Sequence, residues 1–246
     1  MRKKLYVDGV DLSTYGVYIS GSGTYGAPSR KLELTDIPNR NGAILGIDKS
    51  YSNISVSYPC FIYASLDTNI ANLRSFLLSR SGYVKITDDY HTGEYSLGIY
   101  EGPFTPTIQK TGDAGSFTLT FNCMPQRFLD SGDTIITGLK SGGTVTNPTR
   151  FDSLPIIFLK KVAGGTFTIN GVTLSYYASG ANYNVTIDCA SMECYDTDTG
   201  DSCNNKLSST TFDFPVLAPG TNTITTNLGW NEADGDLKIQ PRWWTL

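Results

Sequence analysis

Alternating apolar and polar residues recur along the chain and predict a mostly β structure. In Ser52–Tyr63, for example, Ile54, Val56, Tyr58 and Cys60 point to one face while polar residues point to the other. Alternation of this kind is typical of strands with one buried face. The same pattern predicts further strands in the first half of the chain at Leu5–Val7, Val10–Leu12, Val17–Ser20, Tyr83–Thr87, Tyr95–Tyr100 and Phe117–Cys123.

One segment follows helical spacing instead. Between Leu66 and Leu77 the apolar residues recur every three or four positions, which predicts an amphipathic helix. Asp67 or Thr68 can cap the start of this helix, and Gly82 can end it.

A long stretch, residues 21–49, shows little periodicity of either kind. Within it, Asn41-Gly42 is a turn signal, as is Asp8-Gly9 between the first two predicted strands, where it favours a type I′ hairpin. An irregular segment of this length is unusual inside a compact domain and is usually functional or held against a partner. We therefore expect residues 21–49 to form an extended arm.

The composition changes near Gly138–Pro148, which predicts a domain boundary. We expect an N-terminal domain over residues 1–137, a linker over 138–150 and a C-terminal β-sandwich over 151–246. The turn signals of the second half are Gly164-Gly165, Asn170-Gly171, Gly180–Asn182, Asp196–Ser202 and Pro219-Gly220. The strands predicted between them are Ile156–Leu159, Phe167–Ile169, Val172–Tyr176, Val185–Cys189, Ile224–Thr226 and Leu237–Ile239.

The charge pattern argues against two classes of partner. The net charge is −4, and no basic cluster follows Arg2–Lys4, so sequence-specific nucleic-acid binding is not expected. The apolar run after these basic residues ends at Asp8-Gly9, too early for a secretion signal. No run of 18 apolar residues occurs, so no membrane contact is predicted.

The residues that usually carry catalysis do not form a recognisable pattern. His91, the single histidine, lies in a predicted turn, and no serine lies in a nucleophile elbow. The acidic loop after Cys194 lacks the register of a calcium loop, and the cysteines lack the paired spacing of a zinc site. We therefore predict no catalytic residue, metal or cofactor, and we keep Cys194–Cys203 as a candidate disulfide.

The aromatic residues of the second half suggest one binding surface. Tyr176, Tyr177, Tyr183 and Trp230 are candidates for contact with a glycan or a protein partner, although such residues are also common in cores. Near the end of the chain, Trp243 and Trp244 are candidates for packing back at the junction of the two domains.

Several stretches, in this order and spacing, resemble the distal tail protein family of phages that infect Gram-positive bacteria. The resemblance covers nearly the whole chain. The stretches that carry it are Tyr6–Ser13, Tyr15–Val17, Ile37–Gly42, Tyr51–Asn53, Tyr58–Cys60, Leu73-Arg74, Gly82-Tyr83, Asp88–His91, Cys123–Leu129, Asn147–Thr149, Ile187–Cys189, Phe214-Pro215, Pro219–Asn222 and Pro241–Leu246.

The resemblance implies a fold and a set of partners. The N-terminal domain would resemble tail-tube subunits, a β-sandwich or barrel with one helix, and the C-terminal domain would be a galectin-like β-sandwich. Six copies would form a ring around the DNA channel, with each arm wrapping a neighbour. The predicted contact residues of the arm are Ile37, Pro38, Asn39, Arg40, Asn41 and Gly42, with Arg40 free to pair with a neighbour's carboxylate.

The function that these expectations favour is structural. Assembled in the host cytoplasm, the ring would join the tail tube to the tail fibre or tail-associated lysin at the virion's tail tip. Its outer domain would hold a receptor-binding protein or touch a cell-wall glycan. The alternative is a carbohydrate-binding module or adhesin, and a glycan-degrading enzyme is a third class for which no catalytic constellation is visible.

Overall fold

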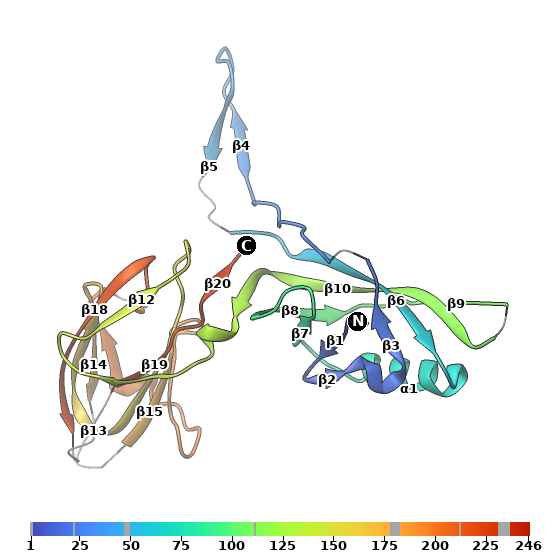
Figure 1. Ribbon diagram of the computed structural model, residues 1–246. Helices are drawn as coiled ribbons and strands as arrows, with labels where there is room; N and C mark the ends of the chain where they lie inside the picture. The colour runs from blue at the N-terminus through green and yellow to red at the C-terminus, as the bar shows by residue number, and fades with distance from the viewer. Residues whose placement is uncertain are drawn as a thin grey trace. The chain divides into compact units, whose positions relative to one another are not determined.

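The computed structural model describes residues 2–21, 23–46, 50–110, 112–177, 183–211, 213–230 and 237–246. Within them the chain is mostly β, as predicted, and has a single α-helix (Figure 1). The chain divides into an N-terminal unit, Met1–Arg127 with Leu246, and a C-terminal unit, Phe128–Thr245. No helix in the described residues has both the length and the hydropathy to cross a membrane.

The N-terminal unit is built on one antiparallel sheet whose main path runs β2-β1-β7-β8-β10-β6-β3. Burial alternates along β6, so Val56, Tyr58, Cys60 and Ile62 face the core, which confirms the predicted strand. The strands and the short 3₁₀ helix of this unit are β1 (Leu5–Val7), β2 (Val10–Asp11), η1 (Leu12–Tyr15), β3 (Val17–Ile19), β4 (Glu33–Asp36), β5 (Ala43–Gly46), β6 (Ile54–Tyr63), β7 (Val84–Asp88), β8 (Glu94–Tyr100), β9 (Thr107–Ile108) and β10 (Ala114–Leu129).

The hairpin signal at the start of the chain and the helix are confirmed, but the predicted caps of the helix are not. Asp8 and Gly9 both have positive φ, 52° and 76°, which is the signature of the predicted type I′ hairpin between β1 and β2. Helix α1 spans Leu66–Leu78 and buries Leu73 and Leu77. Its N-cap is Ser65 in a left-handed conformation, without a side-chain cap, so the predicted caps at residues 67 and 68 are wrong.

The C-terminal unit gathers its strands around one apolar core. β13 is central: its first half pairs with β15 and β19, and its second half pairs with β14 and β18. The elements are η2 (Asp130–Gly132), β11 (Ile136–Leu139), β12 (Thr144–Asn147), β13 (Ile156–Ile169), β14 (Val172–Tyr177), β15 (Tyr183–Asp188), β16 (Glu193–Asp196), η3 (Asn204–Lys206), β17 (Leu207–Ser209), β18 (Gly220–Trp230), β19 (Leu237–Gln240) and β20 (Trp244–Thr245). The likeness to galectins stays a prediction.

Gly164-Gly165 is not the turn that the sequence predicted, because both glycines lie inside β13. Their φ values are 128° and 127°, and a Cβ on Gly165 would lie 2.2 Å from the carbonyl oxygen of Asn227 on β18. The pair therefore serves a close approach of two strands rather than a reversal of the chain. The predicted turn at residues 180–182 lies outside the described residues.

The predicted linker also differs from the structure. The units divide at Arg127–Phe128, before residues 138–150, and this segment contains β12, which pairs with β18. Val145 and Asn147 are each only 2% exposed. Asn147 donates through its side-chain amide to the carbonyl oxygens of Phe151 and Leu217 at 2.9 and 2.8 Å. A polar, glycine-rich sequence can therefore be core when its amides are satisfied internally.

Candidate functional site

The predicted arm is an ordered β ribbon rather than an irregular segment. Its distal part is the hairpin of β4 and β5, paired from Glu33↔Gly46 to Asp36↔Ala43. Within the described residues no third strand pairs with either one (Figure 1). Closer to the sheet, backbone hydrogen bonds continue the ribbon, from Lys31 N to Ser50 O and from Ser52 N to Ser29 O.

The six residues predicted as arm contacts form the tip of this hairpin. Arg40 N donates to the carbonyl oxygen of Ile37 at 3.2 Å, which closes a turn over Pro38 and Asn39. Asn39 has a φ of 61°, so the turn has proline and a positive φ where a type II turn needs them. Gly42, with a φ of 81°, completes the reversal. The role of the tip in binding a neighbour stays a prediction.

The hairpin exposes large apolar side chains on both faces. Leu34 and Leu45 are directly opposed and share one face, and they are 63% and 53% exposed. Ile44, on the other face, is 45% exposed. A two-stranded hairpin is marginally stable by itself in water, and clustered exposed apolar side chains mark interaction sites. The arm therefore has the properties of a binding element.

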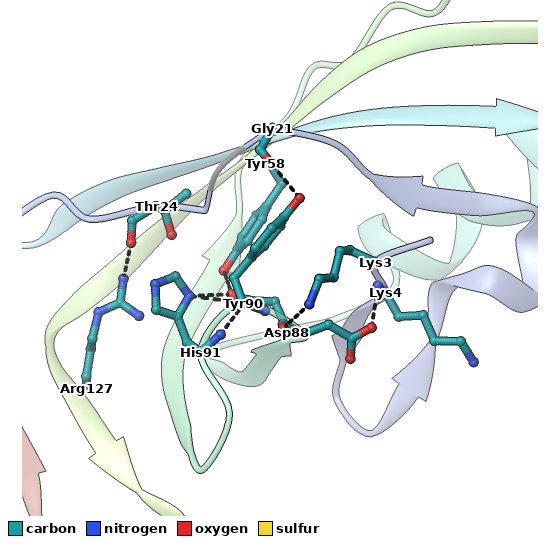
Figure 2. A network of polar contacts seen from close by, with 10 residues as sticks. Lys3, Lys4, Gly21, Thr24, Tyr58, Asp88, Tyr90, His91 and Arg127 are labelled. Carbon is teal, nitrogen blue, oxygen red and sulfur yellow. Dashed lines mark hydrogen bonds and ion pairs between the residues drawn. The ribbon is translucent and has the colours of Figure 1, made fainter. Parts of the chain in front are cut away.

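The arm leaves the sheet at a root that comprises Gly21, Thr24 and Tyr25. Gly21 contacts the turn after β7, and Thr24 contacts the end of β10 (Figure 2). Tyr90 Oη donates to Gly21 O at 2.7 Å, and Arg127 Nη2 donates to Thr24 O at 2.8 Å. The ring of Tyr25 meets the ring of His91 edge-on, with 5.2 Å between the centroids.

The turn that holds the root is organised by Asp88. Its Oδ1 accepts from the backbone N–H groups of Tyr90 and His91 at 2.8 and 2.9 Å, and its Oδ2 accepts from Tyr58 Oη at 2.9 Å. His91 Nδ1 lies 3.0 Å from the same carboxylate. Burial, and the Asp88 charge after it, raises the pKa of Tyr58 above its ordinary value, so this phenol stays a donor.

His91 is thus a partly buried partner of Asp88, and the expected polar turn residue is part of a structural network. Its side chain is 9% exposed, and its Nε2 has no hydrogen-bond partner in the described residues. The hydroxyl of Thr24, in the arm root, is likewise buried without a partner there. Two buried polar atoms, one in the arm root and one beside it, therefore lack a hydrogen-bond partner in the described residues.

Two of the predicted contact residues of the C-terminal unit, Tyr176 and Tyr177, point to opposite faces of β14. Tyr176 is 1% exposed and belongs to the core, so the prediction that it contacts a partner is wrong. Tyr177, its neighbour in β14, points outward and is 65% exposed. The side chains of Tyr183 and Trp230 lie outside the described residues. A surface pocket on this unit is lined by other residues, namely Leu174, Met192, Asn204, Leu207, Ser209 and Phe214.

The end of the chain contributes to the C-terminal unit itself. Trp243 is 4% exposed within the core of this unit, and Trp244 stacks on Phe151 with 4.4 Å between ring centroids. Beside them Arg242 forms a two-point ion pair with Asp188, at 2.7 and 3.0 Å. The predicted role of the two tryptophans at the domain junction stays a prediction.

All five cysteines are buried free thiols, so the candidate disulfide between Cys194 and Cys203 is not formed in this structure. The two residues are neighbours through the backbone, with Cys203 N donating to Cys194 O at 2.7 Å. In the acidic loop between them, Asp196 Oδ1 accepts from the N–H groups of Asp198 and Thr199. The carboxylates of that loop therefore take part in turn formation.

Sequence reasoning missed the arm root. Tyr90 and Arg127 lie in stretches used for the family resemblance, but nothing local connects them with Gly21 and Thr24. Arg127 and Thr24 are 103 positions apart. The hairpin itself had a local signal, because Ile37–Gly42 is a turn sequence between two short runs of strand-forming residues.

Comparison with known proteins gives one family match. The family model described as a phage tail protein RIFT-related domain matches residues 10–123, which covers most of the N-terminal unit. No curated protein matches the chain in sequence.

Solved structures similar to this chain extend over both units. The crystal structure of the SPP1 Dit protein, described as a paradigm of hub adsorption apparatus in Gram-positive infecting phages, has a TM-score of 0.73 at 16% identity, covering 97% of this chain and 98% of that chain. Two structures of the phage P2 baseplate in its activated conformation, with Ca and with Sr, have TM-scores of 0.52 at 12% identity. They cover 97% of this chain, and 98% and 97% of their own. At such low identity the TM-scores show a shared fold, and this fold together with the family match bears out the predicted resemblance.

Proposed function

Because residues 10–123 match the family model of phage tail protein RIFT-related domains, we propose that this chain is the structural hub subunit at the distal end of a phage tail. The observation that carries the proposal is the arm, an exposed apolar hairpin on a domain of a tail family. The similarity to a hub adsorption protein along both units supports the same role.

In this proposal six copies form a ring, and each arm docks on a neighbouring copy. A ring needs a heterologous contact whose rotation closes, so one surface must project and another must receive it. The hairpin fits the projecting side because its apolar faces and free strand edges gain both burial and backbone hydrogen bonds in a complex. Arg40 at the hairpin tip would pair with a carboxylate of the next copy.

The ring would join the tail tube on one side to the tail fibre or tail-associated lysin on the other, and the genome would pass through its channel. The C-terminal unit would offer its outer surface to a receptor-binding protein or a cell-wall glycan, with Tyr177 as an exposed aromatic contact. The role is that of a virion component without catalysis.

The first test is the solution mass of the full-length protein by light scattering over a concentration series. A mass of six or twelve times 26.8 kDa supports the ring. A monomer at every concentration, also in the presence of the tail-tube subunit, would overturn it. Binding of isolated cell-wall glycan by that monomer would favour the adhesin alternative.

A further inference from the structure

Among the described residues, two hydrogen bonds and one ring contact hold the arm at its root, and each has a distinct donor or ring. Tyr90 binds Gly21 O, Arg127 binds Thr24 O, and His91 supports the ring of Tyr25. These contacts come from two separate elements, the turn after β7 and the end of β10. Contacts from two directions restrict rotation of the root as well as its separation from the sheet.

Apolar packing at the root is limited. A hollow of about 70 Å³ lies there, and its lining includes Thr24, Gly26 and Pro28 of the arm, Ser57 of β6, and Arg127. Tyr25 itself is 76% exposed. Because close packing cannot fix a segment that borders a hollow, the direction of the arm depends on the hydrogen bonds of Tyr90 and Arg127.

The turn that carries Tyr90 is held firmly although the root is not closely packed. Tyr90 lies in a turn whose backbone donates two hydrogen bonds to the buried carboxylate of Asp88. The hydroxyl of Tyr58, a core residue, donates a third hydrogen bond to Asp88. On the other side of the turn, Lys3 Nζ donates to the carbonyl oxygen of Asp89 at 2.9 Å. The turn is therefore a fixed support, continuous with the core of the N-terminal unit.

Gly23 shows how closely the root follows this support. Its φ is 86°, and a Cβ at this position would lie 3.2 Å from Cβ of Tyr90 and 3.3 Å from the ring of Tyr25. The backbone passes Tyr90 at a distance that favours glycine, in a conformation that also favours glycine. The sequence thus permits one close path for the arm over the turn.

We propose that Tyr90 and Arg127 are positioning residues, which set the direction of the arm before assembly so that the hairpin of β4 and β5 meets a second copy already oriented. The inference rests on the proposed function, in which the hairpin binds that second copy. Fixing a binding element in its bound orientation strengthens association because less conformational entropy is lost on docking. The two residues need not touch the second copy to have this effect.

The direct test measures the arm in the full-length protein. Spin labels are placed at the hairpin tip through Arg40→Cys and on α1 through Asp67→Cys, and labelled chains are diluted into unlabelled ones so that only distances within a chain are seen. The five native cysteines are at most 3% exposed and escape labelling in the folded protein. The distance distribution is compared among the parent, Tyr90→Phe, Arg127→Gln and the double variant.

Two matched controls separate arm positioning from general effects. Tyr83→Phe removes a phenol hydroxyl that accepts one hydrogen bond away from the root, from Asn53, and Arg74→Gln removes a guanidinium from the exposed face of α1. The width of the distance distribution is expected to grow at least about twofold in the double variant and to stay constant in both controls. Assembly measured by light scattering is expected to weaken roughly tenfold in the double variant, the equivalent of one to two hydrogen bonds.

The outcomes distinguish this inference from the proposed function. An unchanged width, or a broader distribution with unchanged assembly, would overturn the positioning role. If replacing the exposed leucines of the hairpin also leaves assembly intact, the proposed role of the arm fails with it. Should the double variant unfold, the single Tyr90→Phe variant, which keeps the ring and removes one hydroxyl, decides the matter by the same two measurements.

Discussion

Replacing Leu34 and Leu45 by serine tests the arm most directly. The two side chains are opposed across the hairpin and share one face, so a partner that covers one covers the other. They are 63% and 53% exposed in the single chain. Complete burial of a leucine side chain is worth about 1.5–3 kcal/mol, so burying the exposed fractions gives about 1–2 kcal/mol each.

The pair should therefore contribute about 2–3 kcal/mol to each contact between copies, since part of the gain is offset by ordering of the side chains. That corresponds to a pairwise dissociation constant roughly 30- to 150-fold weaker in the double variant. The assay is sedimentation velocity or light scattering over a concentration series that spans this range. At a concentration where parent and variant are both dissociated, the thermal midpoint should not fall, because neither side chain belongs to a core cluster.

Leu78→Ser serves as the matched control. Leu78 ends α1 and is 61% exposed, almost the same as Leu34, but it lies outside the arm. A loss of assembly in the arm variant without a loss in this control supports the reasoning. Equal behaviour of the two variants, whether both assemble or both dissociate, would refute the assignment of the interface to the arm face.

Three further predictions concern stability and chemistry. Burial acts to raise the pKa of Asp188, but Arg242, through its hydrogen bonds and charge, together with the backbone N–H groups of Ala190 and Ser191, outweighs burial and lowers this pKa below its ordinary value. Arg242→Gln should therefore cost about 1–2 kcal/mol at neutral pH in denaturant unfolding. This difference should vanish as pH falls through the lowered pKa, and a constant difference down to pH 2 would contradict the ion pair. Gly165→Ala should destabilise by at least about 2 kcal/mol, seen as a lower denaturant midpoint, because the new Cβ would meet the Asn227 carbonyl, whereas Gly171→Ala, with open space around it, is the milder comparison. Burial raises the pKa of four thiols, to about 12 for Cys60, Cys189 and Cys194 and to about 11 for Cys123. A thiol reagent should therefore modify these cysteines at pH 8 only after unfolding. Fast labelling of the folded protein would contradict this.

The sequence predicted elements well where one face of a strand or helix is buried. β6 and α1 have such a face, and their apolar periodicity gave both their type and approximate bounds. β4 and β5 have no buried face, and every residue of β4 is exposed. Because no core selects their apolar positions, these residues show no clear period. The signal for the arm was therefore the turn sequence at its tip.

Two kinds of contact could not be predicted from local patterns. Gly164-Gly165 looks like a turn, and only the approach of β18 shows why glycine is needed inside β13. Tyr176 and Tyr177 are adjacent aromatic residues of opposite fate, because successive residues of a strand point to opposite faces and the register of β14 decides which one is buried. Tertiary pairing thus decided what composition left open.

The burial of all five cysteines affects how the folded protein withstands oxidising conditions. Every cysteine is a buried thiol, and the structure needs no covalent bond between any two of them. A protein of this kind folds fully under reducing conditions and presents almost no thiol to oxidants when its surroundings become aerobic. Its fold should therefore be the same under reducing and oxidising conditions, and no disulfide has to form after folding.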